Sequence, residues 1–152
     1  MKTNRSFAPY GTWESAFSPS EIASQIRLQD VQSDNQSETL VWLEERSDRR
    51  VLVARDQMSA GQRDLTRKIS TKARVNYGGG DFCVLGGCVY FVSESVIYKQ
   101  NLESTEVTVV VSLDGEIAAP TVSPDGRWLL FVHSQNRIDT LELVLISLSP
   151  AR

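Results

Sequence analysis

The sequence has no long apolar run and no surplus of positive charge. None of its uninterrupted apolar segments approaches the ~20 residues of a membrane-spanning helix, and the amino terminus has no apolar signal-peptide core. Lysine and arginine number 16 against 19 aspartates and glutamates, which gives a formal net charge of -3. This balance provides no electrostatic attraction for nucleic acid or an anionic membrane. We therefore expect neither partner, and we expect a cytoplasmic location.

Residues that bind metals or form disulfides are also scarce, with two cysteines and one histidine. Cys83 and Cys88 flank the pair Gly86-Gly87, and a two-residue turn there would place the thiols diagonally on neighbouring strands. Diagonal neighbours are usually too far apart for an unstrained disulfide, so we interpret both cysteines as reduced, packed thiols. Together with His133 they are too few for a metal site. We expect no metal and no other cofactor.

A nucleophile motif is missing as well. The sequence G-x-S-x-G, which exposes the catalytic serine of α/β-hydrolases, does not occur, and the alternation of strands and helices of a hydrolase sheet never begins. His133 follows an apolar strand without an activated serine to accompany it, so we interpret it as a residue at a sheet edge. As it stands, the chain is not expected to be an enzyme.

The clearest structural signal that is present lies between Ala118 and Ser134. The sequence Ser-Pro-Asp-Gly at 123–126 is typical of a tight turn, because proline presets the first corner, aspartate caps the backbone and glycine adopts the left-handed conformation. The almost wholly apolar run from Trp128 to Val132 follows, and such a run indicates a strand that neighbouring sheets cover on both faces. The segment therefore predicts a β-hairpin.

Weaker copies of this unit occur along the chain, and together they predict eleven strands. The first unit contains Ile26 to Val31, Leu40 to Leu43, Val51 to Arg55 and Gln62 to Thr66; the second contains Phe82 to Leu85, Val89 to Val92, Val96 to Lys99 and Glu106 to Val111; the third contains Ala118 to Val122, Trp128 to Val132 and Leu141 to Ser147. The second strands, at Leu40, Val89 and Leu129, are offset by 49 and 40 residues. The insert 67–80 accounts for the longer offset.

A repeat of roughly 40 to 45 residues with four strands per unit is typical of propeller blades. The predicted fold is therefore all-β: a partial β-propeller of about three four-stranded antiparallel blades, at about 26–66, 81–111 and 118–148 within the domain 26–152. Propellers close with about 4 to 8 blades, so two blade faces would remain uncovered. The chain would then be part of a longer polypeptide or assemble with other chains. A two-sheet sandwich is the alternative fold.

Residues 1–25 form a lead-in that contains one helix signal. Ser18 is a suitable N-cap, Pro19 suits the first helical position, and Glu21 completes a capping box. The sequence therefore predicts a short helix from about Pro19 to Gln25, and strands from there onward.

Three motifs in order carry a family resemblance: YGTWES at 10–15, ARVNYGGGDF at 73–82 and SPDGRWLLFVHS at 123–134. Together they resemble the amino-terminal propeller of prolyl-oligopeptidase-family serine peptidases, in the branch that includes acylaminoacyl peptidases and dipeptidyl aminopeptidases. The resemblance covers about residues 7–148. It implies a propeller segment that gates the access of peptide substrates to an α/β-hydrolase domain, which this chain lacks. The alternative is a separate propeller-type module that binds proteins or peptides and completes its ring as a homo-oligomer.

The best candidates for substrate contact lie in the insert 74–81. Arg74 provides a cation and Tyr77 a phenol beside three consecutive glycines, which permit a close backbone approach. The resemblance implies that loops at this rim shape the cavity facing the active site, so Arg74, Asn76 and Tyr77 are the predicted substrate-binding residues. Many relatives have an acidic residue before the tyrosine, whereas Asn76 stands there in this chain. The alternative is a crossover between blades that needs glycine for packing.

Two further features have structural interpretations. The mixed-charge run from Glu44 to Arg50 indicates a solvated connection in a hairpin. Trp42 and Trp128 occupy comparable places in two units, and we expect them to fill the space between blades.

Overall fold

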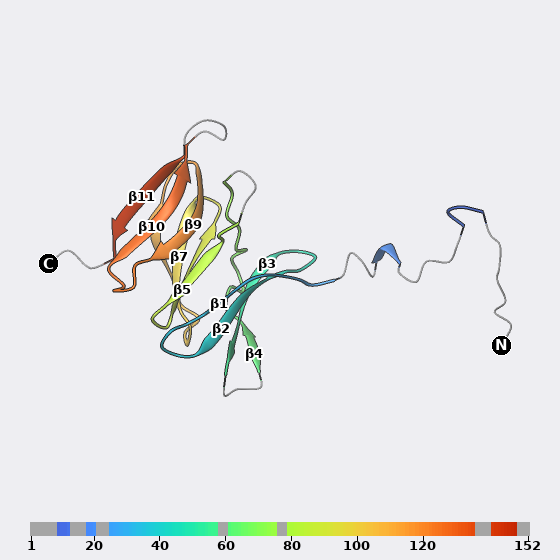
Figure 1. The fold of residues 1–152 in the computed structure, drawn as a ribbon, viewed down its shortest axis with the longest axis horizontal. Helices are drawn as coiled ribbons and strands as arrows, with labels where there is room; N and C mark the ends of the chain where they lie inside the picture. Colours follow the sequence, from blue (N-terminus) through green and yellow to red (C-terminus); the bar gives the residue numbers. More distant parts are fainter. Residues whose placement is uncertain are drawn as a thin grey trace.

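The computed structural model describes residues 9–12, 18–20, 25–57, 61–75, 79–135 and 141–148. Within these ranges the chain forms eleven strands in three antiparallel sheets, and it completes each sheet before it begins the next (Figure 1). All eleven strands lie where the sequence predicts them. Three successive sheets also exclude the two-sheet sandwich.

Within each sheet, strands that are consecutive in the chain are neighbours. The first sheet contains β1 (Arg27–Ser33), β2 (Thr39–Glu45), β3 (Arg50–Asp56) and β4 (Gln62–Asp64); the second contains β5 (Phe82–Leu85), β6 (Cys88–Ser93), β7 (Val96–Asn101) and β8 (Val107–Ser112); the third contains β9 (Glu116–Val122), β10 (Trp128–Ser134) and β11 (Glu142–Ser147). The third sheet has three strands among the described residues, where the repeat predicts four.

The turn that joins β9 to β10 has the chemistry expected from its sequence. Gly126 has a φ of +72°, and its N–H donates to the carbonyl of Ser123 at 2.8 Å. Asp125 accepts hydrogen bonds from the Ser123 hydroxyl at 2.5 Å and from the Arg127 N–H at 3.1 Å. These hydrogen bonds, that of Ser123 first, lower the pKa of Asp125 to about 2. The turn is therefore held by its own side chains.

The amino-terminal lead-in is described only in part. Pro19 and Ser20 are helical and Gln25 is not, while the rest of the expected helix lies outside the described residues. Among the described residues, no helix has both the length and the apolar character needed to cross a membrane.

The second sheet lies between the other two, and its side chains alternate between two separate cores. One core lies between the first and second sheets and contains Val41, Leu43, Leu52, Ala54, Leu65, Phe82, Val89, Phe91 and Leu102. The other lies between the second and third sheets and contains Ala73, Tyr90, Val92, Ile97, Ile117, Ala118, Leu129 and Phe131. Strand β5 contacts both β1 and β9, so the first strands of the three sheets gather on one side of the stack.

The two outer faces of this stack carry exposed apolar side chains. On the third sheet, Leu130 pairs with Leu145, and Leu143 is 74% exposed on the same face. Trp128 also belongs to this face and is 43% exposed, so the expectations that it fills the space between blades and that its strand is covered on both faces are wrong. Successive side chains of a strand point to opposite faces of the sheet, and Trp128 is on the face that points away from the second sheet.

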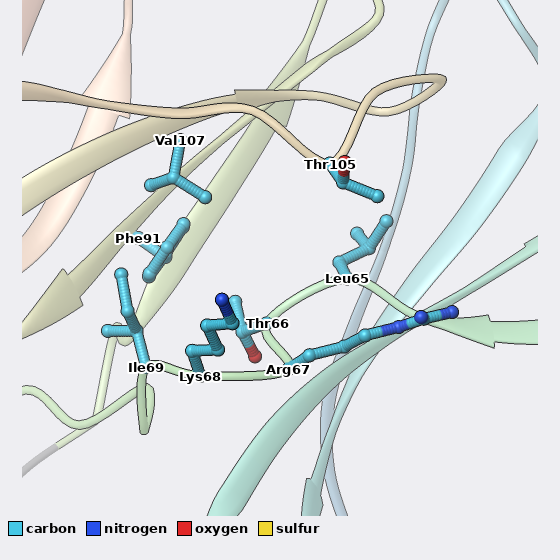
Figure 2. A pocket seen from close by; sticks show the side chains of 8 residues that line it. All are labelled: Leu65, Thr66, Arg67, Lys68, Ile69, Phe91, Thr105 and Val107. Carbon is cyan, nitrogen blue, oxygen red and sulfur yellow. The ribbon is translucent and has the colours of Figure 1, made fainter.

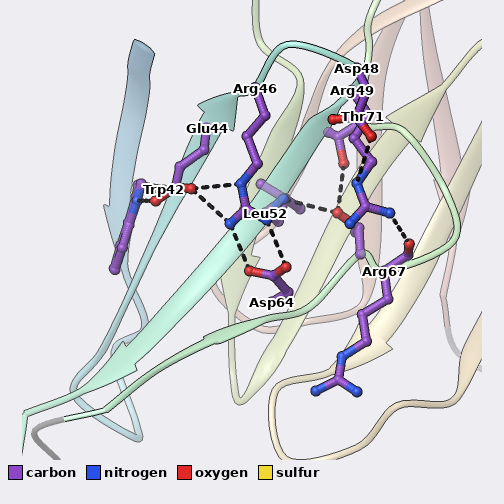
Figure 3. A network of polar contacts seen from close by, with 10 residues as sticks. Trp42, Glu44, Arg46, Asp48, Arg49, Leu52, Asp64, Arg67 and Thr71 are labelled. Atoms are coloured by element: carbon purple, nitrogen blue, oxygen red, sulfur yellow. Dashed lines mark hydrogen bonds and ion pairs between the residues drawn. The ribbon is translucent and has the colours of Figure 1, made fainter. Parts of the chain in front are cut away.

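Side chains of the first sheet also alternate between an inner and an outer face, and the outer face carries a charge network. Trp42 lies there rather than between blades, and its indole N–H donates to Glu44 at 3.0 Å. Arg46 lies between Glu44 and Asp64, 2.8 Å from each carboxylate (Figure 3). The hydrogen bonds to Asp64 and Glu44 raise the pKa of Arg46. Because Glu44 is buried, the expectation that residues 44–50 form a solvated connection is wrong for their first part.

Candidate functional site at the axial rim

The insert between the first and second sheets is held at its base by one buried carboxylate. Asp81 is 4% exposed, and its Oδ1 accepts the N–H of Ala73 at 2.7 Å. The same carboxylate pairs with Arg50 of β3, at 2.9 Å to Nη1 and 3.2 Å to Nη2. Asp81 therefore ties the two ends of the insert to each other and to the first sheet.

Strand β9 holds the same two ends from the other side. The N–H of Arg74 donates to the carbonyl of Ile117 at 3.3 Å, and the N–H of Ala119 donates to the carbonyl of Gly80 at 2.7 Å. Gly80 has a φ of +60°, and a Cβ at this position would lie 2.7 Å from the Cα of Ala119. This close approach agrees with the interpretation of the insert as a crossover between blades, in which glycine is needed for packing.

The three predicted substrate-binding residues are described only in part. Arg74 has an exposed side chain, and its backbone is fixed by β9. Asn76 and Tyr77 lie outside the described residues. A role for the three in substrate contact therefore stays a prediction.

A cavity of about 320 Å³ lies beside the base of the insert. It is lined by the first strands of all three sheets, with Asp30 and Gln32 from β1, 82–85 from β5 and 119–122 from β9, together with Gly80. In the propeller arrangement these strands surround the axis, so the cavity opens where the three blades meet. We name this hollow the axial cavity.

Backbone irregularities mark two walls of the axial cavity. Asp30 has a φ of +40° at a register shift of β1, and Ala119 has a φ of +53° where β9 shifts against β10. Residues with a Cβ rarely adopt this conformation, and bulges of this kind are frequent next to functional sites. Sequence reasoning missed both, because an isolated Asp or Ala in a strand gives no signal of a bulge.

The polar groups of the axial cavity are arranged around Gln32. Its Nε2 donates to the carbonyl of Phe82 at 3.0 Å and to Asp30 Oδ2 at 3.3 Å, while its Oε1 accepts the N–H of Val84 at 3.1 Å. Two of these hydrogen bonds join β1 to β5, and the third fixes the Asp30 side chain. The exposed carboxylate of Asp30 retains accepting capacity and could take an N–H or an ammonium group of a ligand.

The remaining candidates for chemistry have structural roles. His133 is 5% exposed, and its Nε2 lies 2.7 Å from the carbonyl of Asp114. It belongs to β10, the central strand of the third sheet, and pairs with both Ile117 and Glu142, so the expectation of a residue at a sheet edge is wrong. Cys83 and Cys88 are free and partly buried on either side of the two-residue turn. Burial raises the pKa of Cys83 to about 12, which makes it a poor nucleophile. No group of three or more potential ligands among the described residues could hold a metal ion.

Comparison with known proteins identifies the fold. No family model and no curated protein matches the sequence. Among solved structures, the chain is similar to a Mycobacterium tuberculosis puromycin-hydrolyzing peptidase, with a TM-score of 0.70 and 18% sequence identity. The fold is a partial β-propeller. The match covers 94% of this chain and 25% of the peptidase chain, so this chain spans about a quarter of that protein's length.

Proposed function

We propose that this chain is the non-catalytic propeller segment of a serine peptidase of the prolyl-oligopeptidase family, and that it shapes the access of peptide substrates to an α/β-hydrolase domain. The observation that supports this most strongly is the structural similarity of almost the whole chain to a quarter of a known peptidase. The ordered motifs YGTWES, ARVNYGGGDF and SPDGRWLLFVHS point to the same family.

The axial cavity and the base of the insert supply the groups that such a role needs. The carboxylate of Asp30 accepts hydrogen bonds from the N–H or ammonium groups of a peptide, and the exposed cation of Arg74 binds its carbonyl or carboxylate oxygens. Asp81 and Gly80 hold the base of the insert, and this fixes the backbone position from which the Arg74 side chain extends. Bond cleavage itself belongs to the hydrolase domain.

A chimera tests this proposal. The matched quarter of the mycobacterial peptidase is replaced by this chain, and the hydrolysis of puromycin and of aminoacyl chromogenic amides is measured. We expect a folded chimera that retains hydrolysis, and we expect Arg74→Gln or Asp30→Asn to raise KM several-fold. Lys72→Gln is the control, because Lys72 is an exposed cation two residues before Arg74 that is not one of the predicted substrate-binding residues.

Two results would contradict the gating role. The first is a folded, active chimera in which neither Arg74→Gln nor Asp30→Asn changes KM. The second is an equal effect of Lys72→Gln, which would indicate a general effect of charge. Circular dichroism and the melting temperature of each variant separate these outcomes from misfolding.

The exposed outer faces favour a second candidate, a propeller-type interaction module that completes its ring by self-association. Two copies would supply twice three sheets, which lies within the range of about 4 to 8 blades in closed propellers. Joining the outer face of one third sheet to the first sheet of the other copy would cover Leu130, Leu143 and Leu145 as well as Leu28 and Val31. Such a ring would present its axial cavity to proteins or peptides.

Light scattering coupled to size-exclusion chromatography tests the second candidate. We expect a discrete dimer that Leu143→Glu converts to monomer, because the new carboxylate would be buried in the contact. Val109→Glu is the matched control, since Val109 is similarly exposed but lies on β8 of the second sheet. A wild-type monomer, or equal dissociation by both variants, would rule out this candidate.

A further inference from the structure

A second cavity, of about 420 Å³, lies between the first and second sheets on the side away from the axis. One wall is the segment 65–69 that leaves β4, and the other includes Phe91 of β6 and Val107 of β8 (Figure 2). None of its lining residues also lines the axial cavity. We name it the outer cavity. Its volume lies within the range of about 300 to 1,000 Å³ typical of small-molecule sites.

The interior of the outer cavity is apolar and firmly packed. Phe91 is fully buried and stacks on Tyr98, with ring centroids 5.4 Å apart. Leu65 belongs to the same core, and Ile69 and Val107 pack against it. These walls favour an apolar group of a ligand, since burying it removes apolar surface from water.

The rim of the outer cavity carries positive charge. Arg67 and Lys68 both line it, and none of the described lining residues is acidic. Figure 2 shows the Lys68 ammonium group turned toward Thr66 and Phe91, whereas Arg67 extends away. Within the described part of the chain, Lys68 has no hydrogen bond or ion pair. A free cation above an apolar floor matches a ligand that is anionic at one end.

The backbone of this rim is fixed before any ligand binds. The N–H of Leu65 donates to the carbonyl of Leu52 at 2.8 Å, and the N–H of Leu52 donates to the Thr66 hydroxyl at 2.9 Å. The guanidinium of Arg49 donates to the carbonyl of Arg67 (Figure 3). A preformed rim lowers the entropy that binding would otherwise cost.

We propose that the outer cavity binds a small carboxylate that carries a bulky apolar group. The carboxylate pairs with the Lys68 ammonium group, and the apolar group packs against the partly buried side chains of Ile69 and Val107. This site shares no lining residue with the axial cavity and uses none of Arg74, Asn76 and Tyr77, so it does not depend on the proposed function.

Isothermal titration with a matched pair of probes tests the proposal. The probes are N-acetylphenylalanine and its neutral amide, which differ only in the charged end. We expect the carboxylate to bind at least about fivefold more tightly than the amide, and added salt to reduce this difference. Lys68→Met should weaken binding of the carboxylate about tenfold, since methionine keeps the apolar stem but removes the charge.

The control is Lys72→Met, which makes the same change of charge on an exposed lysine that does not line the outer cavity. We expect it to leave the affinity unchanged, and Lys68→Arg to retain most of the binding. Equal affinity for both probes, no effect of Lys68→Met, or an equal loss in Lys72→Met would overturn the proposal. So would the absence of binding to the folded wild-type chain. Amide NMR shifts provide a second readout and should appear at Thr66 and Thr105, rather than at Asp30.

Discussion

At the scale of single residues, the direction of a side chain decides its contribution to stability more than its size does. Along β10, Leu129 and Phe131 face the second sheet and are fully buried. Trp128 and Leu130 point to the opposite face and are exposed. The largest side chain of the strand therefore removes less apolar surface from water than a smaller neighbour does.

The opposite directions of Phe131 and Trp128 lead to a prediction for a pair of alanine variants. Phe131→Ala should lower the free energy of unfolding by about 3 to 5 kcal/mol, the usual cost of truncating a buried aromatic side chain. Trp128→Ala should lower it by about 1 kcal/mol or less, because its ring is partly solvated. Urea unfolding of the isolated chain measures both. Equal losses would show that the face bearing Trp128 is covered in solution.

Asp34 is a buried carboxylate that joins the first sheet to the second. Its Oδ2 accepts N–H groups from Gln36 at 3.1 Å and Ser37 at 2.8 Å, and its Oδ1 accepts the N–H of Gly87 at 2.9 Å. Burial of the carboxyl opposes its ionisation, but these hydrogen bonds outweigh burial and lower the pKa of Asp34 below 3.8. The charged form is therefore more favourable in the folded than in the unfolded chain.

Removing this carboxylate should change both the stability and its dependence on pH. Since the pKa of Asp34 is lower in the folded chain, its stabilising effect is present above pH 3.8 and is lost as the pH falls through the folded value. Asp34→Ala should lower the free energy of unfolding by about 1 to 3 kcal/mol near neutral pH. The gap between wild type and variant should narrow below the unfolded pKa. Urea unfolding at a series of acidic pH values measures this difference in stability. A difference that stays constant with pH would contradict the lowered pKa of Asp34.

At the scale of elements, turn chemistry and repetition predict most of what the structure contains. The Ser-Pro-Asp-Gly turn and the Gly86-Gly87 turn lie between strands as expected. The sheets could be predicted because each of these turns specifies a short connection between consecutive strands. The face of each strand could not, because continuous apolar runs such as β10 give no parity signal.

The candidate site was less predictable than the sheets. The glycine-rich neighbourhood indicates Arg74 as a candidate, but the bulges at Asp30 and Ala119 have no signature in the sequence. The Asp81 anchor depends on Arg50, which is 31 residues away in the chain and approaches only when the first two sheets pack. Likewise, the network of Glu44 with Arg46 depends on the strand that carries Asp64.

The base of the insert offers a test with two adjacent glycines. Both have positive φ, +100° at Gly79 and +60° at Gly80, but a Cβ on Gly79 would meet no atom within 4 Å. Gly79→Ala should therefore lose only about 1 kcal/mol of stability through backbone strain. Gly80→Ala should lose roughly 1 to 3 kcal/mol more, because its Cβ would collide with the backbone of Ala119. Thermal unfolding compares the two, and equal losses would contradict the close packing of Gly80 against β9.

At the scale of the whole molecule, the three sheets differ in how completely they are covered. The second sheet has a core on each of its faces, whereas the third sheet has one face toward solvent. The outer face of the first sheet is intermediate, with Leu28 and Val31 exposed but Val51 and Val53 buried. In β6, Val89, Tyr90, Phe91 and Val92 are all buried, while β11 alternates exposed with partly buried residues. Local opening therefore exposes far less new apolar surface in the third sheet than in the second.

This gradient should be visible in amide hydrogen exchange of the isolated chain. Opening of β6 disrupts both cores, so its amides should exchange only through near-global unfolding and be the slowest. Amides of β11 should exchange through local opening, at rates higher by orders of magnitude, and hydrogen exchange measured by mass spectrometry can follow both strands. If a partner sheet covers Leu143 and Leu145, either in a longer chain or in a dimer, protection of β11 should rise while that of β6 stays nearly constant. Equal protection of the two strands in a proven monomer would contradict the stacking order of first, second and third sheets.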